Sequence, residues 1–278
     1  MTFISPMLLH KTENPFDSAD YITELKLDGI RLLYTRDLNG HTKLYTRHHN
    51  DVTSKFPELV ALNVAPGTVL DGEIIVTDDL GKPDFEAMMS RFQSRFKTYP
   101  VSYVVFDVLQ YKGQSVAHLP LLERKSLLAN LIPKDDSTLA KVQFIEGNAT
   151  AFFDLAVDQS LEGIVIKQKN SKYEIGRRSH SWLKVINYQY KDVFVTGYPK
   201  DEFGWLLADD NRKPLGIMEL GVPLDAKRKA YQATKTGEDD LFVYIEPFKC
   251  RVKYRHLTKM GLLRLPSFVE FVSPPVLV

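Results

Sequence analysis

Lys26-Leu27-Asp28-Gly29-Ile30-Arg31 places an amine, a carboxylate, a glycine and a guanidinium within six residues. Residues 21–25 alternate apolar and polar side chains, which predicts a half-buried strand that ends at Lys26. Gly29 is expected to supply a tight turn behind the lysine. An amine held rigidly at such an edge can attack a phosphate. The pattern K-x-D-G also arises by chance in roughly one chain in fifteen of this size, so a plain surface turn is the alternative.

Composition limits the size, charge and location of the protein. At 278 residues, with 44% hydrophobic residues, the chain can form one large domain or two, and two are favoured. A formal net charge of +1 gives no global attraction to nucleic acid, so any basic surface must be local. The single cysteine, Cys250, excludes an internal disulfide framework and a cysteine-rich zinc site. Without a secretory leader or a run of about 18 apolar residues, we expect a soluble cytoplasmic protein with no membrane partner.

Short strands mixed with helices are predicted up to about Asn187. Apolar residues recur at every third or fourth position within 84–95, 121–131 and 149–159, which predicts three helices. Runs rich in β-branched and aromatic residues predict strands at 31–35, 43–45, 69–76, 103–109 and 163–166. Because these strands do not alternate regularly with helices, the fold class expected is α+β with antiparallel sheets.

The character of the chain changes after Tyr188. Closely spaced strands separated by Gly, Pro, Asn and Asp are predicted at 193–198, 205–208, 216–222, 241–246 and 251–254. Such spacing is typical of a small β-barrel. We therefore expect two domains, formed by residues 1–188 and 189–278.

Two further stretches place carboxylates beside strands. Asp71-Gly72-Glu73 is expected at a turn, where the acidic pair could meet sugar hydroxyls or a metal; taken alone, a solvated hairpin turn is favoured. Asp107 interrupts the apolar strand 103–109 and needs an arginine, a backbone donor or a metal as partner. Phe106 beside it could pack in the core or stack on a base, and core packing is the safer interpretation.

The stretch 162–167 sets a glutamate before a buried strand and a lysine after it. Glu162 is expected on the same row as Ile164 and Ile166. Lys184 stands inside a second apolar strand. Lysines beside buried strands are more often surface charges, but their alternation with acids that could hold Mg²⁺ favours a triphosphate site.

Taken in order, these motifs resemble those of the covalent nucleotidyltransferases, specifically the ATP-dependent DNA ligases, over about residues 20–190. The resemblance implies ATP and Mg²⁺ as cofactors, nicked duplex DNA as partner, and a monomer that forms a lysyl-AMP intermediate. It implies catalytic roles for Lys26 as nucleophile and for Asp28, Arg31, Lys167 and Lys184. It implies nucleotide contacts by Glu24, Lys26, Arg31, Glu73, Phe106, Lys167 and Lys184, and metal contacts by Glu73 and Glu162.

The family resemblance also extends to DNA. Arg47 looks like the arginine that meets the nick phosphate, and Arg178 belongs to a stretch similar to R-S-x-x-W-x-K. From Pro247 to Val269 there are six basic residues and no acidic ones. Within it, Lys249, Arg251, Lys253 and Arg255 alternate, which predicts one strand face that could follow a phosphate backbone. A lysine-protected barrel edge is the alternative. The family implies an OB-fold here, and residues 226–235 form a solvated helix or, less favoured, an insertion that encircles DNA.

Two departures from the family pattern keep other functions open. Ile186 stands where many relatives carry a second lysine, and the terminal motif at 263–268 lacks its usual Asp-Lys pair. NAD-dependent relatives add a domain before the nucleophile and a four-cysteine module, neither of which is visible. An RNA ligase or capping-type enzyme is the nearest alternative. A nucleic-acid-binding module with an inactive transferase site is the other.

Overall fold

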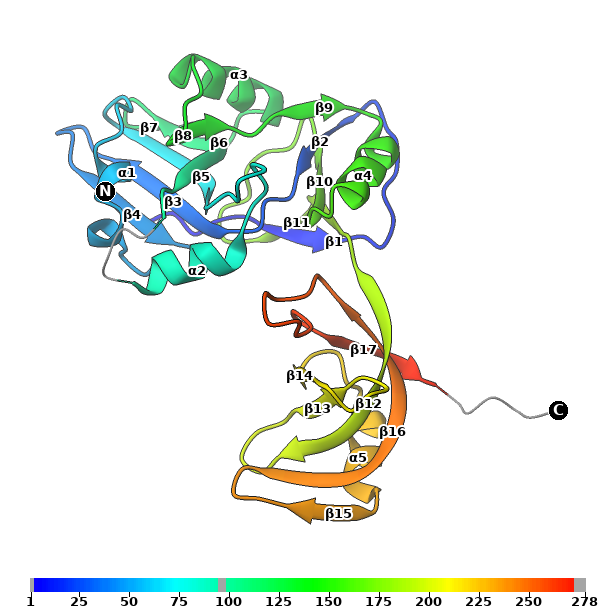
Figure 1. Cartoon of the computed structure of the whole chain (residues 1–278). Coiled ribbons are helices and arrows are strands. Elements are labelled where there is room, and N and C mark those ends of the chain that lie inside the picture. Colours follow the sequence, from blue (N-terminus) through cyan, green and yellow to red (C-terminus); the bar gives the residue numbers. More distant parts are fainter. Residues whose placement is uncertain (1–2, 95–98, 273–278) are drawn as a thin grey trace. The chain divides into compact units, whose positions relative to one another are not determined.

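The computed structural model describes residues 3–94 and 99–272 (Figure 1). The chain divides into two compact units, Met1–Asn187 and Tyr188–Val278. This division lies one residue from the boundary expected from the sequence. None of the helices in the described ranges is both long and apolar enough to cross a membrane.

The first sheet of unit 1 has five strands. They are, in spatial order, β1 (Leu8–Lys11), β11 (Arg178–Ile186), β10 (Gly163–Gln168), β2 (Tyr21–Leu25) and β9 (Phe144–Glu146). Helix α4 (Ala149–Asp158) covers one face, because Ala149 and Ala156 pack with Ile164, Ile166 and Val185. Helix α4 therefore does not cover the opposite face of β2, β10 and β11.

The second sheet of unit 1 has six strands. They are β4 (Thr42–Thr46), β3 (Ile30–Arg36), β5 (Thr68–Ile75), β6 (Ser102–Tyr111), β7 (Gln114–Ser115) and, also paired with β6, β8 (Leu139–Lys141). One of its faces packs on a 3₁₀ turn and three helices: η1 (Thr53–Lys55), α1 (Pro57–Val60), α2 (Phe85–Gln93) and α3 (Leu121–Leu131). Helix α2 begins where the Asp84 carboxylate accepts a hydrogen bond from the Ala87 amide at 2.9 Å. The predicted end of this helix at Arg95 falls outside the described residues.

Two expectations about this unit are corrected. The sheets are mostly antiparallel, as predicted, but β1 pairs with β11 and β6 with β8 in parallel. The Asp71-Gly72-Glu73 stretch is not a turn, because β5 continues through it and pairs with β3 and β6 on either side. A Cβ on Gly72 would lie 2.6 Å from both the Tyr103 ring and the Val104 carbonyl oxygen. This glycine is required by tight packing in the sheet, and both carboxylates project from the opposite face.

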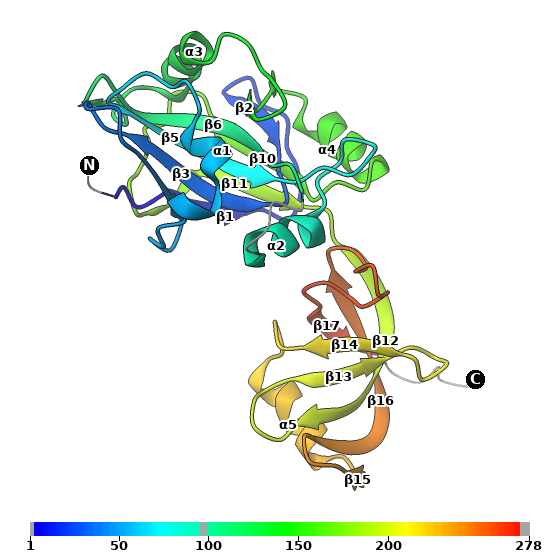
Figure 2. The same ribbon diagram turned by 60° about the vertical axis from the view of Figure 1, so that its left-hand side comes forward.

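Unit 2 is an antiparallel sheet with one helix (Figure 2). Its strands are, in spatial order, β14 (Pro214–Met218), β13 (Trp205–Ala208), β12 (Gln189–Pro199), β16 (Phe242–Tyr254) and β15 (Lys235–Glu238), with β17 (Ser267–Phe271) also on β16. Helix α5 (Leu224–Gln232) packs on the core around Trp205. The two strands predicted at 241–246 and 251–254 are one long strand, β16, which continues through Pro247.

Candidate active site

Side chains from both sheets of unit 1 meet in one shared cluster. Ile22 of β2 and Trp182 of β11 pack with Leu33 of β3, Val69 of β5 and Leu109 of β6. The face of the first sheet that α4 leaves uncovered therefore lies against the second sheet. The candidate site is built at this junction.

Strand pairing brings the predicted lysines and acids to one face. Glu24 and Lys184 both pair with Val165, and Lys167 pairs with Trp182. Directly paired residues and every second residue share a face, so Glu24, Lys167 and Lys184 project together. The Lys26 amide continues the pattern by donating to the Gly163 carbonyl at 2.9 Å. Three segments distant in sequence thus form one charged face.

The predicted nucleophile follows β2 and contacts a buried acid. The Lys26 Nζ donates to Glu162 Oε2 at 2.9 Å, with the lysine side chain 20% exposed and the glutamate 2%. Glu162 was expected on the same row as Ile164 and Ile166, but it does not continue that row. The strand begins only at Gly163, which has a φ of 138° and whose added Cβ would lie 2.1 Å from the Val185 carbonyl oxygen. The alternation therefore does not extend back to Glu162.

The loop behind Lys26 is held by close packing. A Cβ on Gly29 would lie 2.2 Å from the carbonyl oxygen of Ile74. Gly29 is therefore needed where the loop approaches β5, and the tight turn predicted for it is not the reason for the glycine. Asp28 is buried in the same loop, with 9% of its surface exposed.

Arg31 is fixed by a network that the sequence did not reveal. Its Nε and Nη2 donate to the two oxygens of Asp71 at 2.9 and 2.6 Å. The Tyr173 hydroxyl donates to the same carboxylate at 2.6 Å and accepts from the Met7 amide at 2.9 Å. Burial alone would lower the pKa of Arg31, but the charge of Asp71 outweighs it and raises that pKa. Arg31 is thus a rigid, permanent cation beside the site.

Glu73 is the acid whose ionisation is most disfavoured here. Burial raises its pKa to about 8; Lys26 and Arg31 partly oppose this, while Glu162 and Asp71 add to it. Within the described ranges no group of three or more His, Cys, Asp and Glu side chains could hold a metal ion. Glu73 and Glu162 still suit Mg²⁺, which commonly binds one or two carboxylates together with substrate phosphates.

Glu24 lies between two lysines. Its Oε2 accepts from the Lys167 Nζ at 2.6 Å, and its Oε1 forms an ion pair with the Lys125 Nζ of α3. Burial raises the Glu24 pKa, but the two lysines outweigh it and the pKa is lowered. The Lys167 Nζ lies 4.6 Å from the Phe106 ring centre and 4.0 Å from that of Trp182. Phe106 is therefore at the site as well as in the core.

Lys125 was missed by the sequence analysis. A signal was present, because Leu121, Arg124, Lys125 and Leu128 form one buried stripe of α3 with two cations inside it. Arg124 provides the partner that Asp107 required, through hydrogen bonds of 2.8 and 2.9 Å to its two oxygens. The arginine alternative for Asp107 is thus correct, and a backbone donor, the Val108 amide at 2.8 Å, adds to it.

Comparison with known proteins identifies the family. Residues 6–185 match the profile described as ATP dependent DNA ligase domain. The chain belongs to the ATP-dependent DNA ligase family. It is 50% identical over 268 residues to the SPbeta prophage-derived DNA ligase-like protein LigB of Bacillus subtilis, covering 96% of this chain and 98% of that protein. The prediction of an ATP-dependent DNA ligase is thereby confirmed.

The ligase also resembles part of a longer protein and a ligase of solved structure. It is 28% identical over 282 residues to the multifunctional non-homologous end joining protein LigD of Pseudomonas aeruginosa, covering 98% of this chain but 32% of LigD. A solved structure titled mycobacterial DNA ligase D complexed with ATP and MES matches with a TM-score of 0.62 and 24% identity. That match covers 97% of this chain and 95% of the other, and it shows the shared fold.

Arg47 and Arg178, which are predicted to contact DNA, have hydrogen-bond partners other than the residues of the charged face. Arg47 is exposed, and its Nε donates to His48 Nε2 at 3.0 Å. The Arg178 guanidinium donates to the Leu9 carbonyl. In the part of the chain that the structure describes, both side chains therefore hydrogen-bond to neighbouring segments. Their predicted DNA roles stay predictions.

The predicted basic row of unit 2 is shorter and less charged than expected. Lys249, Arg251 and Lys253 alternate along β16, but Arg255 follows the end of that strand at Tyr254. Lys249 pairs with Asp210 at 3.2 Å, and Arg251 pairs with Asp192 at 2.8 Å. The stretch 247–269 has no acidic residues of its own, but Asp210 and Asp192 from neighbouring segments offset part of its positive charge.

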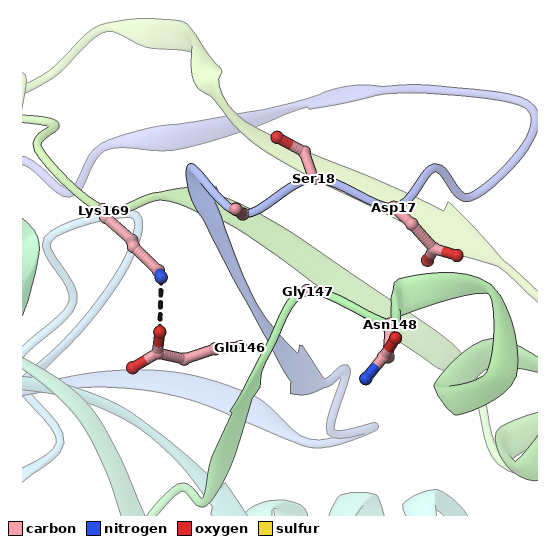
Figure 3. A pocket seen from close by; sticks show the side chains of 7 residues that line it. Asp17, Ser18, Glu146, Gly147, Asn148 and Lys169 are labelled. Carbon is pink, nitrogen blue, oxygen red and sulfur yellow. Dashed lines mark hydrogen bonds and ion pairs between the residues drawn. The ribbon is translucent and has the colours of Figure 1, made fainter.

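A separate shallow hollow lies at the other edge of the first sheet (Figure 3). Lys169 and Glu146 form an ion pair across it, and Asp17 accepts from the Thr150 amide at the start of α4. None of the predicted site residues of the ligase lines this hollow.

Proposed function

We propose that this enzyme seals nicks in duplex DNA with ATP, through a covalent AMP adduct on Lys26. The observation that carries this proposal is the position of the Lys26 amine, partly exposed and hydrogen-bonded to Glu162, on a face with Lys167, Lys184 and Glu24. A nucleophile and several phosphate-binding cations on one rigid sheet are what nucleotidyl transfer requires.

The chemistry has three steps. The neutral Lys26 Nζ attacks the α-phosphorus of ATP, a P–N bond forms, and pyrophosphate leaves with the electrons of the broken P–O bond. An oxygen of the 5′-phosphate of the nick then attacks the phosphorus of the bound AMP, a P–O–P bond forms, and the P–N bond to Lys26 breaks. Finally the 3′-hydroxyl attacks that phosphate, AMP leaves, and the strand is closed. A free lysine has a pKa near 10.4, so nearby cations must favour the neutral amine before the first step.

The side chains around Lys26 divide the work on the nucleotide. Phe106 would stack on adenine, and Glu24 would accept from the exocyclic amine of the base. Lys167 and Lys184 would hold the phosphates, which compensates for Ile186, a buried residue opposite Gly163 that carries no charge. Arg31 or Glu73 would contact the ribose. These roles are the ones that the family resemblance implies. The residues that would perform them lie on or beside β2, β3, β5, β6, β10 and β11.

Glu73 and Glu162 would hold Mg²⁺ close to Lys26. When bound, the ion offsets charge on the phosphates and favours loss of the lysine proton. The chain contributes two buried carboxylates. Burial is the first cause of the raised pKa of Glu73 and Glu162 adds to it, so a bound cation would favour the ionised form of Glu73.

Unit 2 would bind DNA as an OB-fold. Its antiparallel sheet with one helix suits that architecture, and Lys249, Arg251 and Lys253 on β16 provide cations for a phosphate backbone. Arg47, Arg178 and Arg255 would add contacts to the nicked strand. We further propose that the enzyme acts as a monomer in the cytoplasm, where its one cysteine, buried Cys250, stays reduced.

A sealing assay on a singly nicked duplex tests the proposal. We expect sealing with ATP and divalent metal, none with NAD, and a lysyl-AMP adduct detected by mass spectrometry. A matched nick with a ribonucleotide at the 3′-hydroxyl side separates DNA from RNA ligation, since faster sealing of RNA would favour the RNA ligase alternative. Binding of the nicked duplex without any adduct would contradict the proposal and favour an inactive transferase.

A further inference from the structure

Lys125 reaches the nucleotide site from helix α3, outside every predicted motif. Its side chain is only 6% exposed, and its Nζ lies against Glu24 Oε1. The ammonium also lies 5.6 Å from the ring centre of Phe144, which pairs with Glu24 across β2 and β9. Lys125 is thus held from two sides, with Glu24 as its charged partner.

The cluster contains more positive than negative charge. Glu24 carries one negative charge, and Lys125 and Lys167 together carry two positive charges at its two oxygens. Burial lowers the pKa of Lys167 to about 8; Glu24 opposes this and Lys125 adds to it. Because the two lysines share one carboxylate and repel each other, each lysine weakens the ion pair between Glu24 and the other lysine.

We propose that Lys125 is a positioning residue that keeps Glu24 neutralised and in place while Lys167 leaves it to bind a nucleotide phosphate. This inference rests on the proposed function, in which Lys167 meets phosphate and Glu24 meets the base. Without Lys125, departure of Lys167 would leave a buried carboxylate with no cation, which is strongly unfavourable. With Lys125 present, Glu24 keeps a cationic partner both before and after Lys167 moves to the phosphate.

The variant Lys125→Met tests this role because it removes the charge and keeps most of the volume. Glu24 and Lys167 then form a one-to-one pair, so folding is retained and Lys167 is held more tightly. We expect the ATP concentration for half-maximal adduct formation to rise about tenfold, the equivalent of one pKa unit. The maximal single-turnover rate at saturating ATP should change less than about threefold, because Lys125 does not touch the reacting atoms.

Rescue and control variants separate charge from structure. Lys125→Arg restores the cation and should recover most of the ATP dependence, whereas Lys125→Gln should behave as Lys125→Met does. If Lys125→Met fails to fold, Lys125→Gln carries the same test. Lys169→Met is the matched control, since it removes the lysine of another Lys–Glu pair in the same unit. It should leave the ATP dependence unchanged.

A double-mutant cycle with Glu24→Gln decides between positioning and simple support of the fold. With no carboxylate to share, Lys125→Met should no longer alter the ATP dependence, apart from changes below about twofold. An equal effect in both backgrounds, or no effect in the parent, would overturn the inference. Failure of the parent enzyme to form any adduct would instead overturn the proposed function, so the two failures are distinguishable.

Discussion

The two units of this ligase use charge in opposite ways. In unit 1 the ionised groups around the candidate site are buried and joined to one another, as Glu24, Asp71 and Asp107 are to their lysine and arginine partners. In unit 2 the ion pairs lie at the surface, where Arg251 and Asp192 are 45% and 31% exposed. Water screens the surface pairs much more than the buried ones. Burial therefore shifts the pKa values of Glu73 and Lys167 in unit 1, whereas the ion pair of Arg251 and Asp192 in unit 2 stays open to solvent.

The largest expected effect comes from the nucleophile in unit 1. Lys26→Ala should abolish the lysyl-AMP adduct and leave the fold intact, because the side chain is partly exposed at the end of a strand. Transfer of ³²P from α-labelled ATP measures the adduct, with circular dichroism to show folding. Lys43→Ala, which removes a surface lysine paired with Asp51, should label normally. Labelling of Lys26→Ala would refute the assignment of the nucleophile.

Breaking one buried and one exposed ion pair compares the units directly. Arg124→Met should destabilise unit 1 by about 3–5 kcal/mol, because it leaves the Asp107 carboxylate buried without its arginine. Arg251→Met should have little effect on unit 2. Each unit holds one of the two tryptophans, Trp182 and Trp205.

The fluorescence of each tryptophan, with the other replaced by phenylalanine, follows the denaturation of its own unit. The matched single-tryptophan parents serve as controls. Equal destabilisation by Arg124→Met and Arg251→Met would remove the distinction between buried and surface charge on which the comparison rests.

A smaller effect is expected at the exposed loop of unit 1. Arg47→Ala should leave adduct formation unchanged and slow the sealing of nicked DNA about tenfold, the scale of one lost phosphate contact. Arg47 is exposed, and within the described ranges its Nε donates to His48. Separate measurement of labelling and sealing tests this. Equal loss of both steps would mean that Arg47 contacts ATP or supports the fold.

The smallest expected effect is a dependence on pH. Burial lowers the Lys167 pKa to about 8, with Glu24 and Asp107 raising it and Lys125 lowering it. Lys167 is therefore cationic below about pH 8 and loses its charge above it. Apparent ATP affinity should fall by a few-fold as the pH rises through 8, measured by adduct formation at limiting ATP. Lys125→Met should shift this fall to higher pH, and Lys167→Met should flatten it.

Local patterns in the sequence placed many of the elements and the catalytic motifs. Lysines just after or within strands, such as Lys26, Lys167 and Lys184, lie where the alternation of side chains puts them. The acidic stretch at 71–73 was misplaced at a turn, because the sequence does not show that Gly72 packs beneath Tyr103. The long strand β16 was split in two for a similar reason: Pro247 is a turn signal, and only pairing with β12 and β15 reveals a continuous strand.

Sequence by itself determined the family, the predicted nucleophile and the periodicities that put Glu24, Lys167 and Lys184 on one face of a sheet, because these depend on neighbours along the chain. Only the tertiary structure decided which charges share a partner. Lys125 meets Glu24, Tyr173 meets Asp71 and Arg124 meets Asp107 across 17 to 102 residues of sequence. Such pairings are fixed by burial, since a charge removed from water must find its partner within a few ångströms, whatever their separation along the chain.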